Sequence, residues 1–81
     1  MKAFTTDVIA LKKLMIDNNI KNIKELAERS HVDRNTLAKV LNGSAQPSTN
    51  VMQKLMICLN IEPVAAGPIF FSIDLHNTQV H

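Results

Sequence analysis

The sequence is poor in the residues on which several classes of small protein depend. It has one cysteine and two glycines among its 81 residues. The single thiol, Cys58, cannot form a disulfide within the chain, and the three histidines lack the spacing of metal ligands. Two glycines do not make a glycine-rich phosphate loop, and no paired carboxylates or nucleophile–base arrangement is evident. We therefore expect a protein that is not an enzyme and needs no cofactor or metal.

Long apolar runs are also missing. No segment approaches the roughly 18 apolar residues that span a bilayer, and the first residues do not resemble a cleavable leader. Hydrophobic residues make up 46% of the chain and charged residues 20%, which is typical of one small globular domain. We expect a cytoplasmic protein without a membrane partner.

The basic residues are unevenly distributed. All nine lysines and arginines lie in residues 1–54, together with five acids, whereas residues 55–81 contain only Glu62 and Asp74. This excess of positive charge points weakly to an anionic partner such as a nucleic acid. A solvated helical surface would account for it equally well.

Two helices are predicted in the first thirty residues. The first spans residues 6–18, where apolar side chains recur every three or four positions after the capping residue Thr6. The second follows Asn22, which together with Glu25 resembles a capping box, and it runs to about Ser30.

Two more helices follow after a short turn. The third starts at Arg34, with Asp33 as its N-cap, and ends at residues 42–43, an Asn-Gly pair suited to positive φ. The fourth follows the cap Ser48 and ends at Asn60. Because the fourth helix is apolar on nearly every side, we expect it to be central and buried on two faces.

The C-terminal segment breaks the helical pattern. Pro63 and Pro68 interrupt it, and apolar and polar residues then alternate over residues 69–75, which predicts a strand. No second strand-like segment is found, so we expect this strand to pair with its counterpart in a second subunit; the alternative is a loosely attached tail. The chain thus divides into a helical unit, residues 1–62, and an arm, residues 63–81. The expected dimer interface consists of Ile69, Phe71, Ile73 and Leu75.

The paired second and third helices resemble the helix-turn-helix of the lambda-repressor and Cro-like family, also called the XRE family. The resemblance covers roughly residues 8–62, and its most specific parts are Leu26–Ala27, Val32, residues 33–37, Asn42–Gly43 and Pro47–Ser48. It implies an all-α fold, a four- or five-helix bundle built around the helix-turn-helix, to which the predicted C-terminal strand is added.

The resemblance also implies that the third helix enters the DNA major groove. Arginine can donate two hydrogen bonds to guanine, asparagine can pair with adenine, and an alanine methyl can meet a thymine methyl. The alternatives are solvated charge for the basic side chains and plain helix filler for the alanine. The expected base-reading residues are Arg34, Asn35, Ala38 and Lys39.

Phosphate contacts are expected around the start of the second helix, where the free N–H groups and the helix dipole favour an anion. The candidates are Asn22, Lys24, Thr36, Asn42 and Ser44, and Lys21 is within plausible reach. Two positions depart from the family: Ile23 stands where a glutamine is usual, and His31 stands where glycine is frequent. Ile23 leaves open a helix-turn-helix that binds protein in place of DNA.

These features predict a sequence-specific binder of double-stranded DNA, a dimeric repressor of a phage, mobile-element or bacterial operon that recognises an inverted repeat. One alternative is an antitoxin that represses its own operon and neutralises a toxin. Another is a module that binds only proteins. A toxin or an antirepressor would then be the protein partner.

Overall fold

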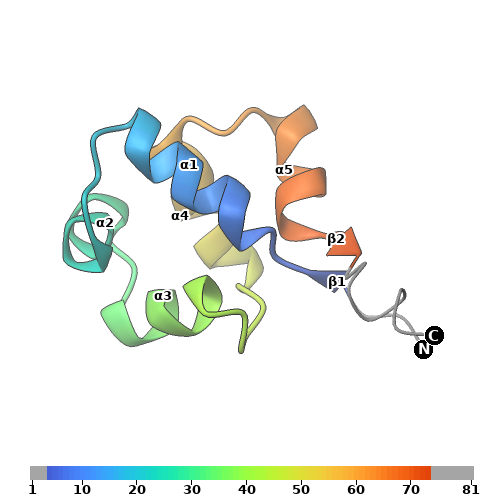
Figure 1. The fold of residues 1–81 in the computed structure, drawn as a ribbon, viewed down its shortest axis with the longest axis horizontal. Coiled ribbons are helices and arrows are strands. Elements are labelled where there is room, and N and C mark those ends of the chain that lie inside the picture. The colour runs from blue at the N-terminus through green and yellow to red at the C-terminus, as the bar shows by residue number, and fades with distance from the viewer. Residues whose placement is uncertain (1–3, 74–81) are drawn as a thin grey trace.

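The computed structural model describes residues 4–73, in which helices dominate (Figure 1). Helices α1 and α4 lie at the centre of Figure 1, α2 and α3 lie on one side, and α5 lies on the other with the two short strands. The elements are β1 (Phe4–Thr5), α1 (Val8–Asp17), α2 (Ile23–Ser30), α3 (Arg34–Leu41), α4 (Thr49–Leu59), α5 (Pro63–Phe70) and β2 (Ser72–Ile73).

Polar side chains cap the first four helices. Asn22, Asp33 and Ser48 each accept a hydrogen bond from the backbone N–H three residues further on, which confirms the predicted starts of α2, α3 and α4. The predicted cap of α1 is wrong by one residue, because Asp7 accepts the bond from the Ala10 N–H.

Thr6, the residue predicted to cap α1, is buried and has another partner. Its hydroxyl lies 3.1 Å from the Gln46 side-chain oxygen, and the Gln46 amide nitrogen donates to the Phe70 carbonyl. The Asp7 N–H donates to the Ile69 carbonyl at 2.6 Å. These bonds join the start of α1, the loop after α3 and the end of α5.

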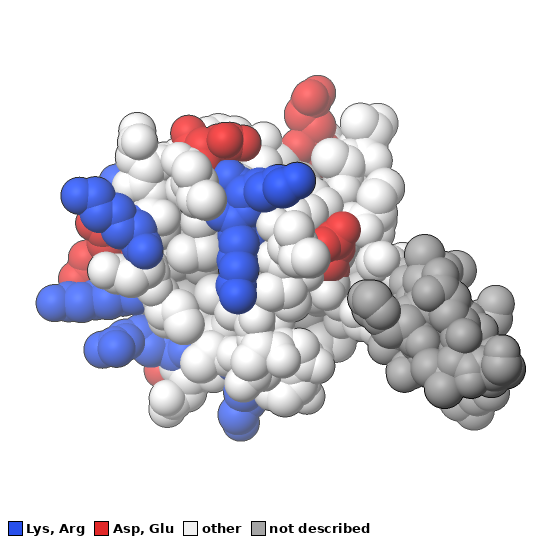
Figure 2. Space-filling model, viewed as in Figure 1, with Lys and Arg blue, Asp and Glu red and all other residues white. Residues whose placement is uncertain are grey.

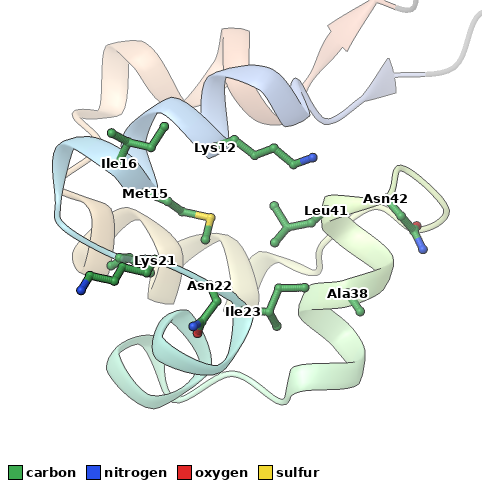
Figure 3. A pocket seen from close by; sticks show the side chains of 10 residues that line it. Lys12, Met15, Ile16, Lys21, Asn22, Ile23, Ala38, Leu41 and Asn42 are labelled. Atoms are coloured by element: carbon green, nitrogen blue, oxygen red, sulfur yellow. The ribbon is translucent and has the colours of Figure 1, made fainter.

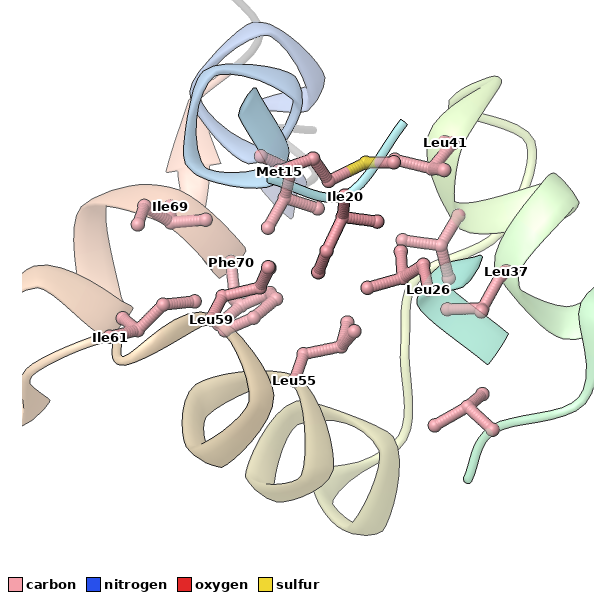
Figure 4. Packing of buried hydrophobic residues seen from close by; sticks show 13 residues of the cluster. Met15, Ile20, Leu26, Leu37, Leu41, Leu55, Leu59, Ile61, Ile69 and Phe70 are labelled. Atoms are coloured by element: carbon pink, nitrogen blue, oxygen red, sulfur yellow. The ribbon is translucent and has the colours of Figure 1, made fainter. Parts of the chain in front are cut away.

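One hydrophobic core is shared by all five helices (Figure 4). Helix α3 packs against α1 and α2, and α5 packs against α1 and α4. The core side chains are Leu11, Met15, Ile20, Leu26, Val32, Leu37, Val40, Leu41, Leu55, Leu59, Ile61, Ile69 and Phe70.

Helix α4 is less buried than its composition predicts. Leu55 and Leu59 are buried on one side of the helix, where it packs against α2 and α5. The Ile57 side chain is 80% exposed. Helix α4 is therefore packed between α2 and α5, but the face that carries Ile57 is open to solvent, so its burial is less complete than predicted.

The C-terminal segment is mainly helical, which corrects the predicted strand over residues 69–75. Pro63 starts α5, at a position where its missing N–H is not needed, and Pro68 is accommodated inside the helix. The helix buries the consecutive residues Ile69 and Phe70. A strand would place these two side chains on opposite faces, whereas the helical turn directs both into the core.

A short strand pair follows the helix. Strands β1 and β2 are antiparallel, with Phe4 opposite Ile73 and Thr5 opposite Ser72. The expectation that no second strand exists is wrong, because the N-terminal segment of the same chain supplies the partner. The Phe4 and Phe71 rings meet edge to face, 6.1 Å between centroids. Leu75, also predicted in the strand, lies outside the described residues.

Substitutions of the neighbours Phe70 and Phe71 distinguish the observed helix from the strand that the sequence predicts. The Phe70 side chain is 1% exposed and that of Phe71 is 50% exposed. We expect Phe70→Ala to lower the free energy of unfolding by about 3–5 kcal/mol because it opens a cavity in the core. Phe71→Ala should lower it by about 1 kcal/mol, the worth of an exposed aromatic pair. Urea denaturation followed by circular dichroism measures both, and a larger loss for Phe71→Ala would contradict the helical arrangement.

Candidate functional site

Helices α2 and α3 form the helix-turn-helix predicted from the sequence. Helix α2 is closed by its C-cap His31, which has φ 61° and ψ 32°, the left-handed conformation that explains why glycine is frequent at this position. The Lys54 ammonium donates to the His31 carbonyl at 3.4 Å. Val32 is buried in the core below the turn.

Buried hydrogen bonds hold this turn. The Ser30 hydroxyl donates to the Leu26 carbonyl at 2.6 Å and accepts from the Val32 N–H at 3.3 Å. At the other end of α2, the Glu25 carboxylate accepts from the Lys21 N–H while Asn22 accepts from the Glu25 N–H. Both ends of α2 are therefore fixed by side chains within the motif, and α3 is held at a constant position beside it.

The rotation of α3 is set by its buried side. Leu37 and Val40 are fully buried, which turns the opposite side of the helix to solvent. Three of the residues predicted to read bases are exposed, and Ala38 is half-buried. The exposed residues are Arg34, Asn35 and Lys39.

An open hollow of about 450 Å³ lies between α1, the start of α2 and the second half of α3 (Figure 3). Its floor is apolar, formed by side chains such as Met15, Ile20 and Leu41. Polar side chains stand around it, and they come from all three elements: Lys12, Lys21, Asn22 and Asn42.

A second hollow, of about 400 Å³, lies at the start of α3. It shares Ile23 and Ala38 with the first hollow and adds the side chains of Asp33, Arg34 and Asn35. The predicted base-reading residues therefore border a recess in the surface, with the exception of Lys39, which lines neither hollow.

Two of the residues predicted to contact phosphate, Asn22 and Asn42, already bond to the backbone of their own segment. Asn22 and Asn42 each use the side-chain oxygen to accept a backbone N–H, from Glu25 and Ser44 respectively, so their amide nitrogens remain to donate to a phosphate.

Three further candidates, Lys24, Thr36 and Ser44, line neither hollow. The Ser44 hydroxyl donates to the Lys39 carbonyl at 3.3 Å, so this bond must break before Ser44 can donate to an anion. Thr36 is half-buried, and Lys24 is exposed in the first turn of α2.

Lys12 is a candidate that sequence reasoning missed. It lies on α1, ten residues before the helix-turn-helix, and lines the first hollow opposite α3. No signal in the sequence singles it out from its neighbour Lys13. Its position depends on the packing of α1 against α3, which is a tertiary contact.

The charge distribution agrees with this placement. In Figure 2, lysine and arginine side chains project from the part of the molecule formed by α1, α2 and α3, with acidic side chains among them, and no lysine or arginine is seen over α5. The amino end of α2, which carries the positive end of the helix dipole, opens on the first hollow through Asn22 and Ile23. This surface therefore suits a polyanion.

Cys58 offers no reactive group to the site. Burial raises the pKa of its thiol, and the nearby Arg29 lowers it by a smaller amount. The thiol is therefore protonated at neutral pH, which disfavours nucleophilic chemistry.

No group of three His, Cys, Asp or Glu side chains in residues 4–73 is placed to hold a metal ion. Helices in this part of the chain are too short to cross a membrane.

Comparison with known protein families identifies the motif. The family model of the Cro/C1-type helix-turn-helix DNA-binding domain matches residues 10–64, a range that includes α2, α3 and α4 in full. No curated protein and no solved structure matches the chain.

Proposed function

The chain belongs to the Cro/C1-type helix-turn-helix family of DNA-binding domains, and on this basis we propose that it is a sequence-specific transcriptional regulator that represses an operon as a homodimer. The observation that carries the proposal is the exposed face of α3, where Arg34 and Asn35 border a recess on a surface rich in cations. The proposed role of the protein is to bind DNA and not to catalyse a reaction.

Base reading is assigned to the exposed residues at the start of α3. An arginine can donate to guanine O6 and N7, and an asparagine can bond adenine N6 and N7, so each discriminates among base pairs in the major groove. Because Leu37 and Val40 hold the other side of α3 in the core, these side chains are presented together. Lys39 lies one turn further along α3 and would extend the contact.

Phosphate binding is assigned to the rim of the first hollow and the start of α2. Lys12 and Lys21 line this hollow from two elements, and Asn22, whose amide nitrogen remains to donate, lines it as well. A DNA strand that follows the rim would meet cations and amide donors, with the positive end of the α2 dipole between them. Lys24, Thr36, Asn42 and Ser44 would add contacts on either side.

The dimer interface requires a change from the predicted set of residues. Ile69 is buried in the core of its own chain and cannot contact a second subunit. Phe71 remains exposed beside Phe4, at the end of the molecule where β1 and β2 pair. We place the two-fold contact at this end; recognition of an inverted repeat then requires the two α3 helices to lie about 34 Å apart, one turn of DNA.

Selection of bound fragments from a random duplex pool at near-physiological salt tests the proposal. An enriched inverted repeat is expected, with a half-site spacing near one helical turn of about 34 Å. Analytical ultracentrifugation with the selected DNA should show two protein chains per duplex. If no sequence is enriched and weak binding disappears with added salt, the surface is one for docking proteins, and the protein-module alternative takes its place.

Substitution of one base-reading and one phosphate-contacting residue should give different results. Arg34→Ala should reduce discrimination at one base pair per half-site by about 1–3 kcal/mol. Lys24→Ala should weaken binding to all sequences alike and lower the slope of log affinity against log salt by about one unit per subunit. Affinities measured on the selected site and on single-base variants, over a range of salt, separate the two effects. If both variants showed the same base preference and the same salt slope, the assignment of Arg34 to a base and of Lys24 to a phosphate would be wrong.

The neighbouring lysines of α1 provide a matched pair for the first hollow. Lys12 lines this hollow, whereas Lys13 is exposed and lines neither hollow. We expect Lys12→Ala to lower the salt slope by about one unit per subunit, because one phosphate contact is lost. Lys13→Ala removes the same charge and should leave the slope nearly unchanged. Equal effects of the two variants would show that net charge matters and that the rim does not.

A further inference from the structure

Ile23 and Ala38 are the two side chains that both hollows share. Ile23 is the first residue of α2, Ala38 lies on α3, and both are half-buried. Figure 3 shows the Ile23 side chain extending from α2 toward α3, where Ala38 lies on the facing helix. Together they form an apolar strip between the apolar floor of the first hollow and the polar side chains of the second.

The residues around this strip favour a base edge over a phosphate as its neighbour. The Asp33 carboxylate lines the second hollow and accepts the Thr36 N–H at 3.1 Å. Its negative charge repels a phosphate group, but a carboxylate can accept a hydrogen bond from an exocyclic amine of a base. Arg34 and Asn35, on the same hollow, supply the donors that base edges accept.

In the major groove, one apolar group distinguishes base pairs, namely the methyl on C5 of a pyrimidine. It has no hydrogen-bonding capacity, so only an apolar contact that excludes water can recognise it. An isoleucine and an alanine provide this contact, whereas a glutamine at position 23 would present an amide to the same methyl.

We propose that Ile23 and Ala38 form a methyl-reading pair that accepts the C5 methyl of a pyrimidine beside the base pair read by Arg34 and Asn35. This inference rests on the proposed function, because it needs DNA in the recess. The methyl belongs either to thymine or to 5-methylcytosine, which present the same group at the same position of the groove. Ile23 is thereby a specificity-determining residue.

The experiment removes the methyl without changing base pairing. Each thymine of the selected duplex is replaced in turn by deoxyuridine, and in a second series each cytosine is replaced by 5-methylcytosine. At one position per half-site, deoxyuridine should weaken binding of the wild-type protein about fourfold per methyl if thymine is the source. If 5-methylcytosine is the source, the second series should contain a position where binding tightens by about the same factor.

Variants of Ile23 assign the effect to this side chain. In Ile23→Ala the methyl effect should fall below about twofold, since little apolar surface remains to be covered. Ile23→Val, which keeps most of the side chain, should be intermediate and covers the case that Ile23→Ala is poorly folded. Ile57→Ala is the matched control, because it removes the same atoms from an 80% exposed side chain on α4; it should retain the full methyl effect.

The results separate this inference from the proposed function. If a duplex is selected but no methyl substitution changes wild-type affinity, the methyl-reading pair is overturned and DNA recognition stands. An equal methyl effect in wild type and Ile23→Ala overturns it as well. If no duplex is selected, the proposed function fails and this inference fails with it.

Discussion

The burial of Leu37 and Val40 is the contact on which the rest of the candidate site depends. These two side chains lock α3 against the core, and a helix locked on one side has a defined opposite side. Arg34 and Asn35 are consequently held beside the same recess. The capping bonds of Asn22 and Asp33 set the residues at which the two helices of the motif begin. Core burial therefore controls which side of α3 faces solvent, and capping controls where along the chain each helix starts.

The surface around this helix combines two kinds of contact. Cations and amides stand around the first hollow, where they suit a phosphate backbone, and they come from α1 as well as from the motif. Between the hollows lies the apolar strip of Ile23 and Ala38. The family's usual glutamine would have added a polar contact at this point. Ile23 offers an apolar surface in place of that polar contact. This changes the base pairs that we expect the site to select and leaves the turn between α2 and α3 as it is.

The C-terminal segment shows how packing overrides a local pattern. Alternation over residues 69–75 predicts a strand, yet Ile69 and Phe70 are both needed to fill the core against α1 and α4. The helical turn directs both side chains into the same core, and the Gln46 bond to the Phe70 carbonyl closes its end. The pairing partner of β2 comes from Phe4–Thr5, a stretch too short to be found by periodicity.

Local chemistry allowed the sequence alone to determine the helices from α1 to α4, three of their caps and the left-handed turn at His31, because each depends on residues within one helical turn. The family and the exposed face of α3 followed from the same short-range spacing. The tertiary structure decided the rest: the helical state of residues 63–70, the exposure of Ile57, and the meeting of Lys12, Ile23 and Ala38 around one recess. These features arise between segments far apart in the chain, and a periodic pattern carries no information on which segments will meet.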